Sequence, residues 1–413
     1  MNVSRPSPDH PAEGHDVFMP ISHVNSRLAQ AGTSIFAEMS GLAAETGSIN
    51  LGQGFPDTDG PAEIARAAAD AVLAGRGNQY PPGRGVPELR EAVAHHQKRF
   101  HGITLDPGSE VLVTAGATEA IAASLLSLLE PGDEVITFEP TYDTYAACIA
   151  MAGGTHVPVP LRPPSFRPDL DALRAAVTPR TRILLLNSPH NPTGTVLTRE
   201  ELASVAELAV ERDLLVISDE VYEHLVYDVE HIPVSTFPGM RERTLTISSG
   251  GKTFSFTGWK VGWVSGPAAL VSAVLTAKQY LTYVSSGPFQ YAIAEALRLP
   301  DDYFDELRQE LRAKRDLLAD GLRSAGFTVH PPDGTYFITT SIRGLSDKDG
   351  LEFCRALPRL CGVAAIPNQV FYRNPGAEAL GLVRFAFCKK TGLLTEAVER
   401  LGSLADGAAR PRP

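Results

Sequence analysis

Short, mainly apolar runs recur through the middle of the chain, and stretches with helical periodicity separate them. These runs are expected to be strands, at 111–114, 135–138, 183–186, 214–217 and 244–247. Strands without polar alternation are typically buried on both faces. Because helices separate the strands, the pattern predicts an α/β fold with a mostly parallel sheet covered by helices.

Local signals place several of the helices. The stretch from Pro87 to Phe100 carries apolar residues at helical spacing, and its proline suits a first helical position. Thr198 and Glu201 form the capping-box pattern for a helix over 199–212. A long helical stretch over 268–297 is then expected to leave the first domain.

The C-terminal part of the chain has a different pattern, which predicts a smaller α+β domain. An amphipathic helix is expected from Phe304 to Leu322, followed by short strands at 335–339, 363–366 and 382–388. The expected division is a disordered tail over 1–17, an N-terminal arm and part of the small domain over 18–61, a large domain over 62–297, a small C-terminal domain over 298–405 and a second tail from 406.

Composition narrows the class of protein. The 413 residues are 43% hydrophobic and 21% charged, as is usual for a globular enzyme. A net charge of -11 argues against nucleic acid or an anionic membrane as partner. The four cysteines show no paired metal spacing and indicate a reducing compartment. With no secretory signal and no bilayer-length apolar run, we expect a soluble, cytoplasmic protein.

Polar residues follow the ends of the predicted strands. They are Thr118, Tyr142, Asn191, Asp219 and Lys252. In an open parallel sheet, ligands bind beyond the carboxyl ends of the strands. The Gly116–Thr118 segment also joins a strand to a helix start, where free backbone N–H groups face an anion. The coincidence of five such residues predicts a ligand site at this edge.

Lys252 carries the most distinctive chemistry. It follows two glycines in the stretch Ser248–Trp263, SSGGKTFSFTGWKVGW. A lysine desolvated in such a turn can lose its proton and form a Schiff base with a carbonyl. The alternative is an ordinary turn with a surface lysine. Arg384, on the predicted strand over 382–388, is likewise either a ligand-binding residue or a structural ion-pair partner.

Seven segments together resemble one enzyme family. They are LGQGFPD, NQYPPGRG, VTAGATEAI, NSPHNPTG, SDEVY, SSGGKTF followed by GWKVGW, and VRFAF. Over residues 28–403 the chain resembles the class I, fold-type-I pyridoxal-phosphate aminotransferases, in particular the kynurenine/glutamine branch and the actinobacterial N-succinyldiaminopimelate enzymes. The resemblance implies a homodimer with shared active sites, pyridoxal 5'-phosphate as cofactor, and no metal.

The resemblance also implies a role for each residue at the cofactor ring. Lys252 matches the Schiff-base lysine, which moves the proton, and Asp219 matches the partner of the pyridine nitrogen. Tyr222 and Asn191 match the hydrogen bonders to the phenolic oxygen. Tyr142 matches the aromatic residue stacked on the ring.

Two further groups follow from the same resemblance. The phosphate is expected to contact Ala117, Thr118, Ser249 and Lys260, with Tyr80 contributed by the neighbouring subunit. The substrate α-carboxylate is expected to contact Arg384, Asn187 and Gly54. Many relatives carry arginine where this chain has Lys260, and lysine keeps the charge but loses the bidentate fork.

The expected reaction is ping-pong transamination between an L-amino acid and a 2-oxo acid. A β-lyase on the same fold and a non-catalytic regulatory relative are the alternatives. Residues 282–288 hold no arginine, which disfavours a simple aspartate enzyme. Arg84 either reaches a distal substrate carboxylate or is a solvated loop residue, and aromatic, methionine and glutamine donors stay open. His190 and His224 are expected to be structural.

Overall fold

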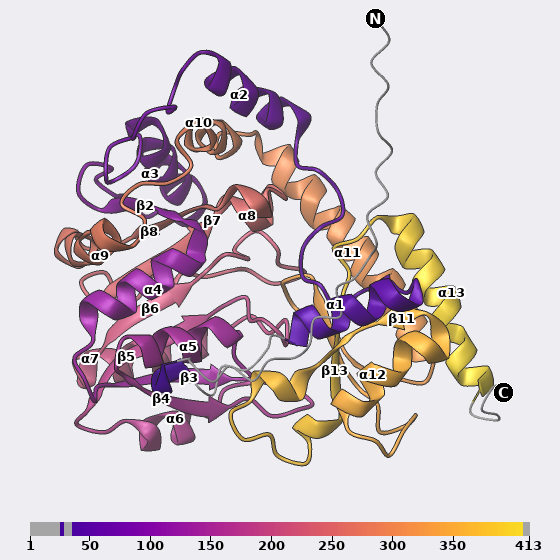
Figure 1. Ribbon diagram of the computed structural model, residues 1–413. Helices are drawn as coiled ribbons and strands as arrows, with labels where there is room; N and C mark the ends of the chain where they lie inside the picture. Colours follow the sequence, from indigo (N-terminus) through magenta and orange to yellow (C-terminus); the bar gives the residue numbers. More distant parts are fainter. Residues whose placement is uncertain (1–24, 29–34, 408–413) are drawn as a thin grey trace, which may run out of the picture.

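The computed structural model describes residues 25–28 and 35–407, and it shows a helix-covered sheet beside a smaller C-terminal lobe (Figure 1). The large sheet has seven strands in the order β2-β8-β7-β6-β5-β3-β4. Its strands are β2 (Val111–Ala115), β3 (Glu134–Glu139), β4 (Thr155–Pro160), β5 (Thr181–Asn187), β6 (Leu215–Asp219), β7 (Thr244–Ser249) and β8 (Val261–Ser265). Only β8 runs antiparallel to its neighbours, β2 and β7. The expected α/β fold is confirmed.

Two strands of this sheet escaped the sequence prediction. In β4, Pro158 and Pro160 interrupt the apolar pattern, and proline cannot donate to a ladder. Because β4 is the edge strand beside β3, the missing donors are tolerated there. The other strand, β8, lies in the glycine- and tryptophan-containing segment after Lys260, where no continuous apolar run marks it.

The two faces of the sheet follow directly from the alternation of side chains along a strand. In β5, Ile183 and Leu185 join a core with α4, α5 and α9, whereas Leu184 and Leu186 join a core with α6 and α7. The bounds of these helices are α4 (Gly116–Leu128), α5 (Asp143–Met151), α6 (Leu170–Ala176), α7 (Arg199–Glu211) and α9 (Ala268–Leu281). Unbroken apolar strands are therefore buried on both sides, as expected.

The single helix expected over 268–297 is wrong. The structure has α9 ending at Leu281 and α10 (Gly287–Ala296) starting after a turn. In that turn Tyr283 and Ser286 adopt φ of 62° and 51°, a left-handed conformation that breaks a helix. Gly287 also abuts another loop, because a Cβ there would lie 2.1 Å from the Gly77 carbonyl oxygen. This tertiary contact fixes where the turn falls.

The C-terminal lobe holds two small sheets. The antiparallel one has the order β12-β13-β10-β9, and the other pairs β1 with β11. Their bounds are β1 (Ile49–Asn50), β9 (Thr328–His330), β10 (Phe337–Ser341), β11 (Val363–Ala364), β12 (Ile366–Pro367) and β13 (Leu382–Ala386). The strand expected over 363–366 is thus two strands in different sheets, and the strand expected at 335–339 starts two residues later. Since β1 pairs with β11, the N-terminal arm contributes to this lobe.

The remaining helices complete both lobes. They are α1 (Ile35–Thr46), α2 (Ala62–Leu73), α3 (Pro87–His101), α8 (Gly250–Thr253), α11 (Asp301–Ser324), α12 (Gly350–Cys361) and α13 (Thr391–Gly407). Residues 406 and 407 are helical and not part of the expected tail; the tail expected over 1–17 lies outside the described residues. The domain boundaries stay predictions. Within the described part of the chain, no helix combines the length and apolar character needed to cross a membrane.

Candidate active site

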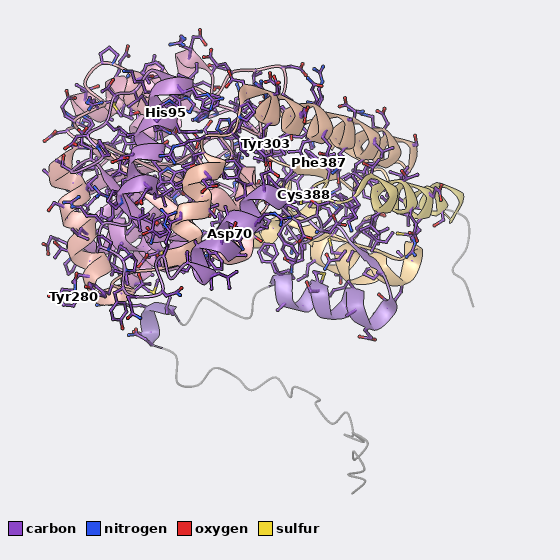
Figure 2. The ribbon with its side chains drawn as sticks, turned by 90° about the horizontal axis from the view of Figure 1, so that it is seen from above. Asp70, His95, Tyr280, Tyr303, Phe387 and Cys388 are labelled. Atoms are coloured by element: carbon purple, nitrogen blue, oxygen red, sulfur yellow. The ribbon has the colours of Figure 1, made fainter. Side chains whose placement is uncertain are left out.

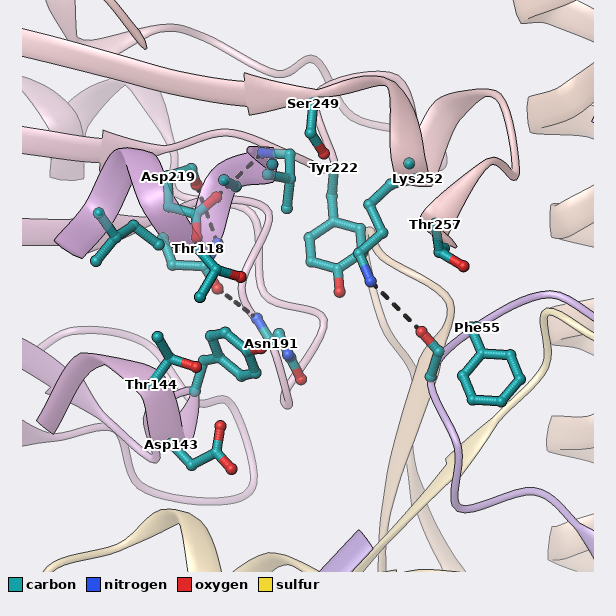
Figure 3. Close-up of a pocket in the computed structure, with 18 of the residues that line it drawn as sticks. Phe55, Thr118, Asp143, Thr144, Asn191, Asp219, Tyr222, Ser249, Lys252 and Thr257 are labelled. Atoms are coloured by element: carbon teal, nitrogen blue, oxygen red, sulfur yellow. Dashed lines mark hydrogen bonds between the residues drawn. The ribbon is translucent and has the colours of Figure 1, made fainter. Parts of the chain in front are cut away.

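A cavity of about 520 Å³ lies at the carboxyl ends of the parallel strands, where the C-terminal lobe meets the large sheet (Figure 3). Twelve of the residues expected at the site line it. They are Gly54, Ala117, Thr118, Tyr142, Asn187, Asn191, Asp219, Tyr222, Ser249, Lys252, Lys260 and Arg384. Most of them stand at or near the ends of strands of the large sheet, whereas Gly54 comes from the N-terminal arm and Arg384 from the C-terminal lobe. Their roles toward a cofactor stay proposals at this point.

Tyr80 does not line the cavity of its own chain. Its side chain is 81% exposed, and its ring packs edge-on against Tyr283 with 5.6 Å between the centroids. Arg84 lies elsewhere too, because its guanidinium donates to the Ser109 carbonyl at 3.2 Å. Ser109 precedes the amino end of β2, away from the cavity. Within one chain, Arg84 therefore does not face a substrate.

Lys252 extends into the cavity from α8, the short helix that follows β7 (Figure 3). Its Nζ lies 3.4 Å from the Gly54 carbonyl oxygen and 5.6 Å from the ring centroids of Tyr222 and Tyr336. Desolvation lowers the pKa of Lys252 to about 8. Gly250 leaves little room for a side chain, because a Cβ there would lie 2.7 Å from the end of the Ile293 side chain. The amine thus has access to its unprotonated form near neutral pH.

Asp219 ends β6 and is buried at the base of the cavity. The Tyr145 hydroxyl donates to its Oδ2 at 2.8 Å, and the Val221 N–H donates to Oδ1 at 3.3 Å. Desolvation outweighs these bonds and raises the pKa of Asp219 to about 6. Sequence reasoning missed Tyr145 as a partner of Asp219. Its only signal is that it lies in α5 about one helical turn after Tyr142, and so on the same side of the helix.

Arg384 enters from β13 and is 1% exposed. Its guanidinium donates to Asn191 Oδ1 and to the Gly52 carbonyl, both at 3.0 Å. It also lies over the Phe337 ring, 4.0 Å from the centroid. Burial lowers the pKa of Arg384 to about 10, so the group is still charged at neutral pH.

The Arg384 guanidinium can still form further hydrogen bonds and an ion pair. Within the described part of the chain its Nε has no hydrogen-bond partner, and no carboxylate lies within ion-pair distance. The structural ion-pair alternative is therefore wrong for the described residues. A buried cation without a carboxylate is costly unless a ligand supplies one. The geometry favours an anionic ligand at this position.

Asn187 and Asn191 are linked to each other. Asn187 Oδ1 accepts from the Asn191 N–H at 2.8 Å, and its Nδ2 donates to the Asp219 carbonyl at 3.0 Å. Asn187 lines the cavity, but its side chain is engaged with the backbone on both sides. It holds the Asn191 loop against the end of β6, and this is a positioning role that the sequence alone did not indicate.

The N-terminus of α4 forms the polar end of the cavity. Lys260 adopts a left-handed φ of 53°, and its Nζ lies 3.4 Å from Thr118 Oγ1. The close approach depends on Gly262, because a Cβ there would lie 2.5 Å from the Gly116 carbonyl carbon. A helix N-terminus of a 13-residue helix beside a lysine is suited to a phosphate group.

Comparisons with known proteins identify the family. The family model for aminotransferase class I and II matches residues 46–401. The chain is 54% identical to a probable N-succinyldiaminopimelate aminotransferase of Mycobacterium tuberculosis, over 93% of this chain and 99% of that protein. It is 42% identical to a methionine aminotransferase of Escherichia coli, over 92% and 98% of the two chains.

A solved structure has the same fold. The N-succinyldiaminopimelate aminotransferase from Mycobacterium tuberculosis superimposes with a TM-score of 0.90 at 54% identity, covering 92% of this chain and all of that one. Fold and sequence agree, and the chain belongs to the class I and II aminotransferase family.

Proposed function

We propose that this aminotransferase moves an amino group from an L-amino acid to a 2-oxo acid with pyridoxal 5'-phosphate as its cofactor. One observation carries the proposal. Three groups face a single cavity: the amine of Lys252, the buried carboxylate of Asp219 and the guanidinium of Arg384, which has no carboxylate partner among the described residues. Those three groups are what the reaction needs: a nucleophilic base, a counter-charge for the cofactor ring and a binding site for a carboxylate.

The donor set fits the cofactor. The α4 N-terminus, Thr118, Ser249 and Lys260 suit a phosphate, and Asp219 suits a protonated pyridine nitrogen. Tyr142 supplies an aromatic face, and Asn191 and Tyr222 supply polar groups for the phenolic oxygen. When bound, the cofactor supplies an aldehyde that takes up the amino group and a ring that accepts electrons from the substrate Cα.

Residues of this chain then bind the substrate, transfer the proton and exclude water. Arg384 holds the substrate carboxylate through a charge-assisted contact and so orients the Cα–H bond. Lys252, with a pKa near 8, takes the proton from Cα on its Nζ and delivers it again. Aromatic walls from Phe36, Phe55 and Phe337 exclude water around these groups.

Charge in the cavity bears on the choice of substrate. Its cations are Lys252, Lys260 and Arg384, and each already has a proposed role. No fourth cation of this chain lines the cavity within the described residues, whereas Asp143 adds a carboxylate. The lining therefore favours a donor with an uncharged side chain. A donor with a distal carboxylate requires a cation from a neighbouring subunit.

Tyr80 supports a homodimer with shared sites. Its ring is exposed, as is Tyr280 at 86% on α9 of the same lobe (Figure 2), so the large lobe presents aromatic side chains to a partner. We infer that Tyr80 reaches the phosphate of the partner's site. A cytoplasmic location is supported by the free state of all four cysteines.

Reductive trapping tests the proposal. Protein incubated with excess cofactor and then treated with borohydride should carry one pyridoxyl adduct, which peptide mapping places on Lys252. Lys252→Ala should lose both the adduct and turnover, while the exposed Lys390→Ala serves as a control. An adduct elsewhere, or none, contradicts the proposal.

A substrate panel then separates the remaining alternatives. Amino donors with aromatic, methionine, glutamine and N-succinylated diaminopimelate side chains are assayed with several 2-oxo acids. Stoichiometric oxo-acid formation indicates transamination. Release of pyruvate, ammonia and a thiol from a cysteine conjugate would instead indicate the β-lyase.

A further inference from the structure

A second group of chemically active side chains lies outside the active-site cavity. His96 comes from α3, and Glu223 and His224 follow β6; we call these three the histidine cluster. One ligand atom of each lies within 4.8 Å of the other two. All three are buried, at 1%, 5% and 8% exposure. None lines the active-site cavity.

The two imidazoles of the histidine cluster face each other. His96 Nε2 and His224 Nε2 are 2.7 Å apart. A hydrogen bond between them uses one proton, so one ring must present a lone pair and the other an N–H. His96 Nδ1 has no partner among the described residues. The pair thus leaves hydrogen-bonding capacity unsatisfied in the interior.

Burial also bears on the protonation of the two rings. It disfavours a charged imidazole, and the neutral imidazole is the form that binds metal ions. Glu223 is buried with the two histidines, so a bound cation would offset the cost of burying its charge.

Neighbouring groups orient the carboxylate. Ser248 donates to Glu223 Oε1 at 2.7 Å, and His101 Nε2 lies 2.8 Å from Oε2. Gln97 Nε2 also lies 3.4 Å from Oε2. Outer partners of this kind are what metal-binding carboxylates have in proteins. Each oxygen can accept more than one contact, so these bonds leave a lone pair for a metal.

A further acidic group and a path to the surface lie beside the histidine cluster. A second buried pair, Glu220 and His231, lies beside the histidine cluster with 2.9 Å between Oε2 and Nε2. A cavity of about 660 Å³, lined by His101, Glu223 and His224, runs from the cluster to a surface that carries Asp305 and Arg308. It provides a path for an ion.

We propose that His96 Nε2, His224 Nε2 and the Glu223 carboxylate bind one divalent transition-metal ion of the Zn²⁺ class, with water in the fourth position. Two imidazoles and a carboxylate are a common ligand set for this ion, with nitrogen at about 2.0–2.1 Å from the metal. Tetrahedral geometry sets the two nitrogens about 3.3 Å apart, so the rings must separate by roughly 0.6 Å from their present spacing.

The ion would tie α3 to the turn that follows β6. Asp219 is the last residue of β6 and Tyr222 lies in that turn, so the ion would stabilise the segment that forms the base of the active site. The sequence hides this arrangement because His96 and His224 are 128 positions apart and show no metal-ligand spacing. The inference is independent of the proposed function.

Metal titration of untagged, full-length, chelator-treated protein tests the proposal. Co²⁺ should give visible d–d absorption that saturates at about one equivalent per chain and is displaced by Zn²⁺. Zn²⁺ should raise the unfolding midpoint. His96→Gln and His224→Gln should each weaken binding by more than the roughly 10–100-fold that loss of an outer partner costs.

The matched control is His95→Gln. His95 lies next to His96 on the same helix but faces solvent (Figure 2), so its replacement should leave binding unchanged. X-ray absorption of the Zn²⁺-loaded wild type, which needs no variant to fold, should show two imidazoles and oxygen ligands. No saturable binding, an equal loss in His95→Gln, or fewer than two imidazoles at the metal would overturn the proposal in favour of a proton-sharing histidine pair.

Discussion

At the residue scale, Arg384 is a buried cation that the described residues leave without a carboxylate. Arg384→Ala should lose a charge-assisted contact worth about 1.5–3 kcal/mol, or roughly 10- to 160-fold in kcat/KM. The loss should appear mainly as a higher KM for the amino donor. Steady-state kinetics measure it, with the exposed Arg359→Ala as control. Equal kinetics for Arg384→Ala and wild type would contradict the assignment.

Burial disfavours the ionised form of Asp219, so this residue lowers the stability of the cofactor-free protein at neutral pH. The folded pKa of about 6 lies above the ordinary value of 3.8 for this carboxyl. At pH 7 the cofactor-free protein therefore bears a cost of about 3 kcal/mol, which vanishes below the unfolded pKa. Asp219→Asn should abolish most turnover yet stabilise the cofactor-free protein, by up to that amount at pH 7 and by less as pH falls from 6 toward 4.

Thermal unfolding of both cofactor-free proteins between pH 4.5 and 7.5 checks the sign. Wild-type stability relative to Asp219→Asn should be lost as pH rises through about 6, because the raised pKa favours the protonated folded form. The new amide cannot accept from both Tyr145 and Val221, which reduces the gain. A difference independent of pH would show that Asp219 is not strained by desolvation.

At the element scale, the anion site depends on how closely β8 approaches the start of α4. A Cβ on Gly262 would lie 2.5 Å from backbone of Gly116, and backbone cannot yield as a side chain can. Gly262→Ala should therefore cost about 1–3 kcal/mol in stability and weaken cofactor binding. Gly258→Ala is the matched control, since nothing lies within 4 Å of its Cβ position. Equilibrium unfolding and cofactor titration of both variants distinguish them, and similar behaviour would contradict the expectation.

At the scale of the whole molecule, a shared site predicts complementation between inactive chains. In a Lys252→Ala/Tyr80→Ala heterodimer, one site combines both defects and the other has neither. A refolded equal mixture should therefore recover about a quarter of wild-type activity, because half of the dimers are mixed and each has one intact site.

The control uses two residues of the same chain's site. A mixture of Lys252→Ala and Arg384→Ala leaves one defect in every mixed site, so no recovery is expected. Activity assays after refolding, with light scattering to establish the dimer, compare the two mixtures. If neither mixture exceeds its separate components, Tyr80 does not act across subunits.

Sequence reasoning recovered the features that depend on local pattern. The buried strands of the large sheet, the alternation of Ile183 to Leu186 between two cores and the start of α3 at Pro87 all follow from periodicity or from backbone chemistry. The set of residues at the strand ends follows as well, because parallel strands bring their carboxyl ends to one edge. Twelve of the thirteen site residues that the family resemblance implied, including the five at strand ends, line one cavity.

The sequence by itself determined the class of fold, the family and which side chains meet at the sheet edge, since each of these is encoded in short segments and their order. Only the tertiary structure decided what depends on contacts between distant segments. Gly287 meets Gly77 and splits a helix, Tyr145 bonds Asp219, and His96 faces His224. The physical reason is that burial and pairing set the conformation and protonation of such groups, and neither property is local to the chain.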